Sequence, residues 1–204
     1  MKATMRRHVP APAITRIAIV ASLVLGCAIG GADAASFDVE TLFDRLAKER
    51  PAYARFQERK YLSLLAQPVE SSGELSFTPP DRLEKRTILP KPETIVVDGT
   101  RLVVERGGRT QTLDLAQNPG IAVLIASVRG TLSGDLAALS REYSIRLDGD
   151  ASEWRLVLRP LTPDLSSLVD RIEIGGVDSQ VRMVTIFQAD GDRSVMTISS
   201  ARAR

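Results

Sequence analysis

Histidine, cysteine and aromatic side chains are scarce in this sequence. Its 204 residues include one His and one Cys, and Phe, Trp and Tyr together make up 4%. His8 and Cys27 both lie within the first 34 residues. If that segment is removed, the chain cannot build a Ser-His-Asp or Cys-His catalytic group, a thiol redox centre or a disulfide. Zinc is also disfavoured, because carboxylates alone rarely hold it. We therefore expect no enzyme, no metal and no cofactor.

The first 34 residues have the pattern of a secretory signal peptide. Basic residues, among them Arg6, Arg7 and Arg16, precede an uncharged apolar run over residues 17–29, and Ala32-Asp33-Ala34 supplies an A-x-A cleavage site. The apolar run is too short for a transmembrane helix, which needs about 20 residues. We expect residues 1–34 to be the signal peptide, residues 35–204 to form a single domain, and the mature protein to lie in the periplasm.

A second way of processing the leader stays open. Val24-Leu25-Gly26-Cys27 resembles a bacterial lipobox, in which the cysteine is lipidated and becomes the mature N-terminus. The mature protein is then either soluble or tethered to a membrane by lipid at Cys27.

Removal of the leader also changes the charge of the chain. The segment holds four basic residues and one acidic residue, so the net charge falls from +2 to −1. Binding of single-stranded nucleic acid requires a basic groove with aromatic side chains, and the sequence has neither. We therefore expect no nucleic-acid partner.

The remaining sequence alternates between short strands and tight turns, with two helical segments. A helix capped by Ser36 runs to Ala47 with one apolar face, and a compact apolar helix covers residues 121–128. Asp98-Gly99 is a strong hairpin signal, and Gly175-Gly176 suggests another turn. About ten strands are expected, at residues 53–64, 73–77, 83–88, 94–97, 100–104, 110–115, 143–147, 154–159, 168–174, 181–188 and 194–200.

These elements predict a mainly β fold with helices, of the α+β class. A long antiparallel sheet must curl or close. We expect a strongly curved antiparallel sheet that forms an open half-barrel. Its apolar concave face would be covered by the N-terminal helix and by the central helix, which would act as a lid.

Charged residues in the predicted strands fit solvent-facing positions better than a site. Acidic residues beside glycine, such as Asp190 and Asp192, are typical of turns. The basic residues are interleaved with the acids Glu58 and Glu84, and their pattern favours a solvated sheet face, with a docking patch for an acidic partner as the alternative. These basic positions are Arg55, Arg59, Arg82, Lys85, Arg86, Arg155 and Arg159.

Several motifs, taken in order, resemble the LolA family of periplasmic lipoprotein carriers. Phe56-Gln57 is followed by the Gly-Glu-Leu-Ser-Phe strand at residues 73–77, by Pro80 and Leu83, and by the Val-Asp-Gly hairpin within residues 95–103. The resemblance covers residues 37–200. It implies a half-barrel that shields acyl chains, receives cargo from an inner-membrane ABC transporter and passes it to an outer-membrane acceptor, LolB. Pro79 stands where the family usually has an arginine that holds the lid shut, which suggests a divergent member with another lipophilic cargo.

The leading hypothesis is a monomeric periplasmic carrier with an apolar binding cavity for an acylated lipoprotein or other lipid. A LolB-like acceptor lipidated at Cys27 is the second hypothesis, and a structural or interaction module with a filled core is the third. Strand alternation places the cavity side chains at Leu75, Phe77, Ile95, Val97, Leu102, Val104, Trp154, Leu156, Leu158, Ile172 and Ile174. The lid would present Ile121, Leu124, Ile125 and Val128.

Overall fold

The computed structural model describes residues 37–48 and 52–200. They belong to one compact unit that spans residues 35–204. The predicted signal peptide, Ser36 and Cys27 lie outside the described residues.

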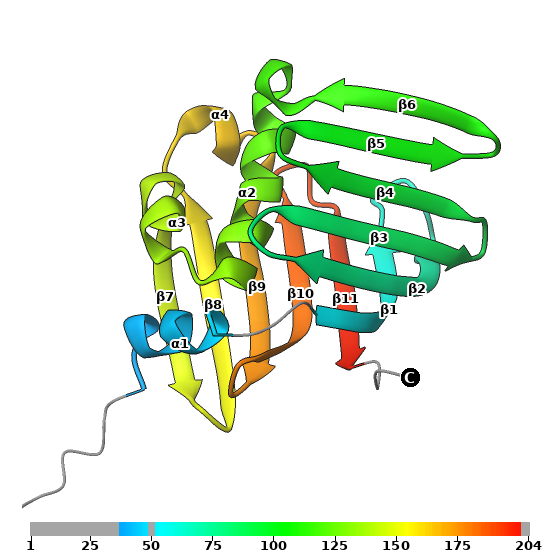
Figure 1. Ribbon diagram of the computed structural model, residues 1–204. Coiled ribbons are helices and arrows are strands. Elements are labelled where there is room, and N and C mark those ends of the chain that lie inside the picture. The colour runs from blue at the N-terminus through cyan, green and yellow to red at the C-terminus, as the bar shows by residue number, and fades with distance from the viewer. Residues whose placement is uncertain (1–36, 49–51, 201–204) are drawn as a thin grey trace, which may run out of the picture. The chain divides into compact units, whose positions relative to one another are not determined.

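An eleven-stranded antiparallel sheet dominates the structure (Figure 1). The strand order is β6-β5-β4-β3-β2-β1-β11-β10-β9-β8-β7, so β6 and β7 are the two edges and the sheet is not closed. This confirms the predicted mainly β, open and curved sheet. The strands are β1 (Ala52–Tyr61), β2 (Val69–Thr78), β3 (Arg82–Leu89), β4 (Glu93–Asp98), β5 (Arg101–Arg106), β6 (Arg109–Asp114), β7 (Tyr143–Asp150), β8 (Glu153–Pro160), β9 (Val169–Val177), β10 (Gln180–Gln188) and β11 (Arg193–Ser200).

Two meanders make up this sheet, and they meet where the first strand pairs with the last. β1 pairs with β11 in a long antiparallel ladder, with Phe56 opposite Ile198. Strands β1 to β6 therefore form an N-terminal half and β7 to β11 a C-terminal half. The direction of the strands changes strongly from one half to the other (Figure 1). This change is the expected consequence of the right-handed twist accumulated over many strands.

The connection between the two edge strands carries three helical elements on the concave face. The 3-10 turn η1 (Leu115–Gln117), α2 (Pro119–Ser133) and α3 (Leu136–Glu142) lead from β6 to β7, and α2 runs from the end of β6 toward α1 (Figure 1). The C-cap of α2 is Gly134, with φ of 72°. A Cβ there would lie 2.5 Å from the Phe43 carbonyl oxygen, so only glycine fits against α1.

Helix α1 (Val39–Leu46) packs its apolar face into the sheet, with Leu42, Phe43 and Leu46 buried. Its N-cap is Asp38, whose side chain accepts a hydrogen bond from the backbone N–H of Thr41 at 2.8 Å. The predicted cap, Ser36, precedes this position. A short helix, α4 (Pro163–Ser166), follows β8.

Two hydrophobic clusters fill the space between sheet and helices. The larger joins α1, α3 and β7 to β9, and includes Trp154, Leu156 and Leu158, each at most 1% exposed. The smaller lies in the N-terminal half and has Val97, Leu102 and Leu115 as its buried members. Helix α2 touches both clusters, through Val123 and Leu124 on one side and Ala122 and Ile125 on the other.

Among the predicted boundaries that differ from the structure, two have a clear physical explanation or consequence. Strand β1 ends at Tyr61, and Leu64, which was expected inside it, is 94% exposed in the following loop. Gly175-Gly176 is not a turn but lies within β9. The reason is steric, since the indole of Trp154 on β8 needs a neighbour without a side chain: a Cβ on Gly176 would lie 2.3 Å from Trp154 Cζ2.

The adjacent glycines of β9 should therefore differ sharply in their tolerance of a methyl group. We expect Gly176→Ala to lower the free energy of unfolding by about 2–3 kcal/mol, because overpacking forces backbone and indole apart. Gly175→Ala is the matched control, since a Cβ there meets atoms only at 3.6 Å or more. Urea unfolding of both variants checks the prediction, and equal losses would contradict it.

Candidate functional site

All eleven strand residues predicted to face a cavity lie on the concave face. The register pairs Leu83 with Val97 and Val97 with Leu102, and in the other half pairs Leu156 with Ile174. Neighbouring strands thus carry their apolar side chains on one side. The eight buried ones are Phe77, Val97, Leu102, Trp154, Leu156, Leu158, Ile172 and Ile174, and the three half-buried ones are Leu75, Ile95 and Val104.

The predicted lid residues do not form one inner face. Leu124 packs against the larger cluster and Ile125 against the smaller, so α2 is buried on two sides. Val128 is half-buried, whereas Ile121 is 41% exposed. The four residues have the i, i+3, i+4, i+7 spacing of a single apolar face. In the structure that face lies between two clusters, and Leu124 and Ile125 divide between them.

The two halves of the concave face are filled to different degrees. In the C-terminal half, α1 and α3 cover the sheet, and the larger cluster has twelve buried members. In the N-terminal half the smaller cluster has three buried members, and Leu83, Ile95, Val104 and Leu113 around it keep partial exposure. Partly buried apolar side chains therefore outnumber the buried ones in the smaller cluster, whereas buried side chains predominate in the larger cluster, which also has partly buried members on β7 and β10.

A buried polar cluster interrupts the apolar concave face. Glu58 on β1 is 5% exposed and shares the inner side of the strand with Phe56. Lys85 Nζ donates to Glu58 Oε2 at 2.5 Å, and Ser194 Oγ donates to Oε1 at 2.6 Å. The ammonium of Lys85 also lies 4.8 Å from the centre of the Phe56 ring.

These contacts correct the prediction that Lys85 and Glu58 face solvent. Strand alternation carries the information, because Glu58 follows Phe56 by two positions and Lys85 follows Leu83 by two. Their charge made them resemble surface residues. Inside the fold, the two side chains instead neutralise each other's charge and form a hydrogen bond with each other.

The ion pair with Lys85 fixes the protonation state of Glu58. Burial raises the pKa of the Glu58 carboxyl, but the charge and hydrogen bond of Lys85 and the hydroxyl of Ser194 outweigh burial, so the pKa ends below its ordinary value. The carboxylate is therefore ionised at neutral pH.

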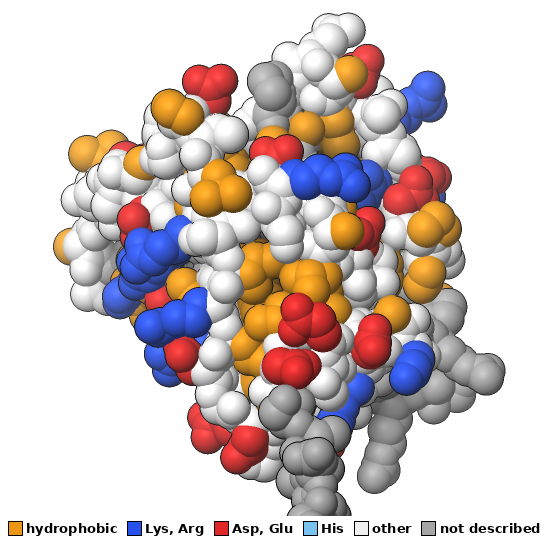
Figure 2. Space-filling view, turned by 90° about the vertical axis from the view of Figure 1, so that its left-hand side faces the viewer, with side chains coloured by type: hydrophobic (Ala, Val, Ile, Leu, Met, Phe, Trp, Pro, Cys, Tyr) orange, Lys and Arg blue, Asp and Glu red, His pale blue; other side chains and the backbone are white. Residues whose placement is uncertain are grey.

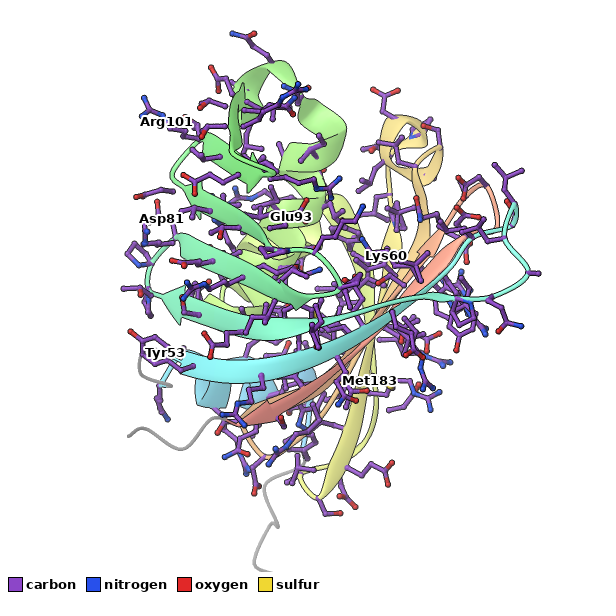
Figure 3. All side chains as sticks on the ribbon, turned by 90° about the vertical axis from the view of Figure 1, so that its right-hand side faces the viewer. Tyr53, Lys60, Asp81, Glu93, Arg101 and Met183 are labelled. Carbon is purple, nitrogen blue, oxygen red and sulfur yellow. The ribbon has the colours of Figure 1, made fainter. Side chains whose placement is uncertain are left out.

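The inward-facing charges continue along the same end of the sheet. Glu93 at the start of β4 pairs with Arg106 at the end of β5. Lys60 Nζ lies 3.8 Å from Glu58 Oε1. Lys60 and Glu93, labelled in Figure 3, mark this polar band on β1 and β4. The concave face is thus apolar toward η1 and α2, and charged at the opposite ends of the strands.

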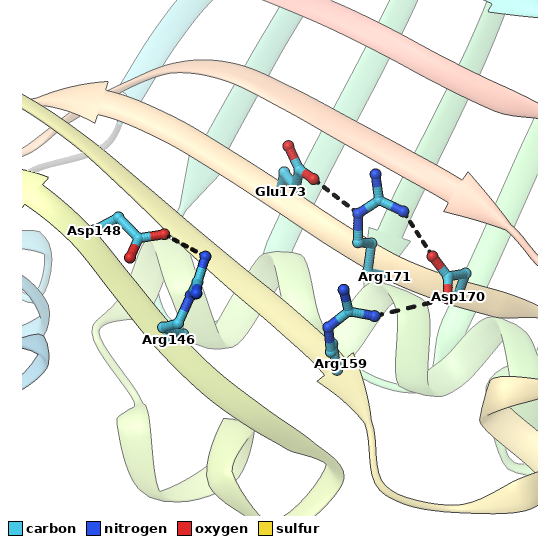
Figure 4. Close-up of polar contacts among 6 residues, drawn as sticks. All are labelled: Arg146, Asp148, Arg159, Asp170, Arg171 and Glu173. Carbon is cyan, nitrogen blue, oxygen red and sulfur yellow. Dashed lines mark hydrogen bonds and ion pairs between the residues drawn. The ribbon is translucent and has the colours of Figure 1, made fainter.

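The convex face of the C-terminal half carries paired charges. Arg171 bonds Asp170 at 2.7 Å and Glu173 at 2.8 Å, and Arg159 lies 3.8 Å from Asp170 (Figure 4). A cleft of about 610 Å³ between Arg159, Arg171 and Phe187 lies on this outer face. Because these acids accompany the arginines, the arrangement favours a solvated face over a docking patch for an acidic partner.

Hydrophobic side chains are also visible from outside. On the side of the molecule where α1, α3 and β7 lie, they gather at the centre, with acidic side chains beside them (Figure 2). No helix among the described residues is long and apolar enough to cross a membrane. Within the same residues, no cluster of three or more His, Cys, Asp or Glu side chains could hold a metal ion.

The buried pair makes a pH-dependent contribution to stability. A carboxyl whose pKa is lowered on folding stabilises the protein above its unfolded value, here 4.5, and that stability is lost as the pH falls through the folded pKa. We expect Glu58→Gln to lower the free energy of unfolding by about 2 kcal/mol at neutral pH. The deficit should shrink on acidification to about pH 3.

Urea unfolding across this pH range measures the deficit. Glu84→Gln, on the outer side of β3, is the control and should show little effect at any pH, since its contact with Arg82 is exposed. A Glu58→Gln deficit that stays constant with pH would contradict the ion-pair account.

Comparison with known proteins gives a family and a set of distant structures. The family model described as "outer membrane lipoprotein carrier protein LolA-like" matches residues 31–203. No curated protein matches the chain. A LolA superfamily protein from Nitrosomonas europaea is similar at 11% identity and a TM-score of 0.45, over 83% of this chain and 96% of that one. LprF from Mycobacterium bovis is similar at 15% identity and a TM-score of 0.34, over 81% and 94%.

Proposed function

Because this chain belongs to the LolA-like family of outer membrane lipoprotein carrier proteins, we propose that it is a periplasmic carrier for acylated cargo. The cargo is a lipoprotein or another lipophilic molecule, whose acyl chains lie between the N-terminal half of the sheet and α2. An inner-membrane ABC transporter supplies the cargo, and an outer-membrane acceptor receives it. The signal-peptide pattern of the first 34 residues supports the periplasmic location.

One observation carries this proposal, namely the uneven filling of the concave face. Leu75, Ile95 and Val104 point inward but keep partial exposure, whereas the corresponding residues of β8 and β9 are buried. Each methylene moved from water onto such side chains is worth about 0.8 kcal/mol. A hydrocarbon chain therefore gains more free energy by packing against the partly exposed side chains of the N-terminal half than by displacing the packed core of the other half.

This asymmetry divides the predicted cavity residues into two roles. Leu75, Phe77, Ile95, Val97, Leu102 and Val104 line the proposed site, together with Ile125 of α2. Trp154, Leu156, Leu158, Ile172 and Ile174 hold α1 and α3 against the sheet as a permanent core.

The contacts of helix α2 allow the sheet to separate from it on one side only. Leu124 is attached to the larger cluster, and the Gly134 cap fits closely against α1. Ala122 and Ile125 contact the smaller cluster, which has few buried members. Separation of the N-terminal strands from α2 therefore disrupts the smaller cluster and leaves the larger one intact.

The lipobox-like tetrapeptide at residues 24–27 supports a second function, an acceptor anchored in the outer membrane by lipid at Cys27. The carrier and the anchored acceptor share the binding site and differ in the mature N-terminus. The mass of the mature protein from its own cells distinguishes them, because a chain that begins at Ala35 has no anchor.

A bulky side chain inside the proposed site should compete with the acyl chain. We expect Ile95→Trp to weaken binding of the fluorescent fatty acid cis-parinaric acid about tenfold or more, equivalent to about 1.4 kcal/mol. Val96→Trp is the matched control, because Val96 is the next residue of β4 and points to the convex face. Fluorescence titration of the three proteins measures the effect.

Thermal melting accompanies each titration, and Val104→Phe replaces Ile95→Trp if that variant does not fold. The carrier proposal fails if wild-type protein purified from its periplasm carries no acylated molecule by native mass spectrometry and takes up no fatty acid. Unchanged uptake by the folded inner-face variant instead excludes this half of the sheet as the site.

A further inference from the structure

Helix α2 contains a single charged residue. Its fifteen residues, PGIAVLIASVRGTLS, include Arg129 and no other ionisable side chain. The Nε and Nη2 atoms of Arg129 are buried and have no hydrogen-bond partner among the described residues. The other polar side chains near the middle of the helix are satisfied, since Ser127 donates to the Leu124 carbonyl and Thr131 to the Ser127 carbonyl.

The position of Arg129 on the helix directs it toward the proposed binding site. Arg129 follows Ile125 by four residues and Ala122 by seven, which places the three on one face of α2. Ala122 and Ile125 pack against the smaller cluster of the N-terminal half. A helical side chain also leans back toward the helix N-terminus, and hence toward Ile125. The guanidinium therefore leaves α2 on the side of the half-filled concave face.

A guanidinium with two buried and unpaired nitrogens is costly for a protein, even though Arg129 as a whole is only half-buried. An unsatisfied buried donor lowers stability, and more so when it is charged. Lys85 does not have this problem, because Glu58 neutralises it.

The two unpaired nitrogens also form a particular edge. The N–H bonds of Nε and Nη2 are parallel in the planar guanidinium, and such a pair can donate hydrogen bonds to two oxygens of a carboxylate or phosphate at once. We propose that this edge of Arg129 binds the anionic head group of an amphiphile whose hydrocarbon chain lies against β3 to β5. This inference rests on the proposed carrier function, and it specifies the cargo as a lipid with a carboxylate or phosphate beside its acyl chain.

Removal of the anion from the ligand should have the same effect as removal of the arginine. Wild-type protein should bind cis-parinaric acid about tenfold more tightly than its methyl ester. Arg129→Leu should bind acid and ester equally, with the ester affinity of wild type. Arg141→Leu is the control, since Arg141 lies on α3 and is exposed, and it should behave as wild type.

A third ligand identifies the source of the anion. Lysophosphatidic acid, measured by native mass spectrometry, supports a phosphate head group if wild type prefers it to parinaric acid, and the reverse order supports a carboxylate. In both cases Arg129→Leu should remove the preference over the ester. Without ligand, Arg129→Leu should melt at a higher temperature than wild type, because an unpaired buried charge is gone. Arg129→Met serves if the leucine variant does not fold.

The proposed function and this inference fail in different ways. Equal binding of acid and ester by wild type, or an acid preference that survives in Arg129→Leu, overturns the role of Arg129 while the carrier function stands. Absence of binding of all three ligands overturns the carrier function, and the inference with it.

Discussion

The pairing of the first strand with the last determines the rest of this structure. Because β1 and β11 form one ladder in the middle of the sheet, the two meanders grow outward from it, and β6 and β7 become opposite edges. The chain between those edges, residues 115–142, connects one side of the sheet with the other, and it crosses on the concave face. Helices α2 and α3 cover that face as part of this connection.

This crossing also explains why the two halves of the interior differ. The chain enters the concave face at η1 beside β5 and leaves it through α3 into β7, and α1 lies beside the C-cap of α2. Helices α1, α3 and α4 contribute buried side chains to the larger cluster, whereas α2 is the one described α-helix that contacts the smaller cluster. The uncovered apolar surface and the unpaired edge of Arg129 lie on that same side. These two features together are the basis of the proposed site for a hydrocarbon chain with an anionic end.

Local sequence patterns predict most of the fold. Asp98-Gly99 identifies the β4–β5 hairpin, and the alternation of Trp154, Leu156 and Leu158 gives the correct inner face of β8. The β1–β11 ladder has no comparable local signal, because it joins residues more than a hundred positions apart. The Gly175-Gly176 pair wrongly suggests a turn. A glycine is needed at position 176 because of the Trp154 indole, which lies on another strand and leaves no local signal in the sequence.

The candidate site is predictable only in part for a similar reason. Strand alternation identifies the inward-facing apolar residues, and it also places Glu58 and Lys85 on the inner side. The charge of these two residues instead favours the wrong prediction that they face solvent. The absence of other charges in α2 marks Arg129 within the sequence, yet its burial without a partner requires the packed structure. Which half of the concave face is filled depends on the crossing of α2, and no local pattern contains that information.

The location of bound hydrocarbon is the most direct test of this account. Stearic acid with a nitroxide on its chain broadens the NMR signals of nearby amides, and assigned spectra with and without the label locate the chain. We expect broadening in β2 to β5 and on the Ala122–Ile125 side of α2, with the signals of β8 and β9 unchanged. Broadening confined to the convex-face cleft around Arg159 and Phe187, or no broadening at all, would contradict it.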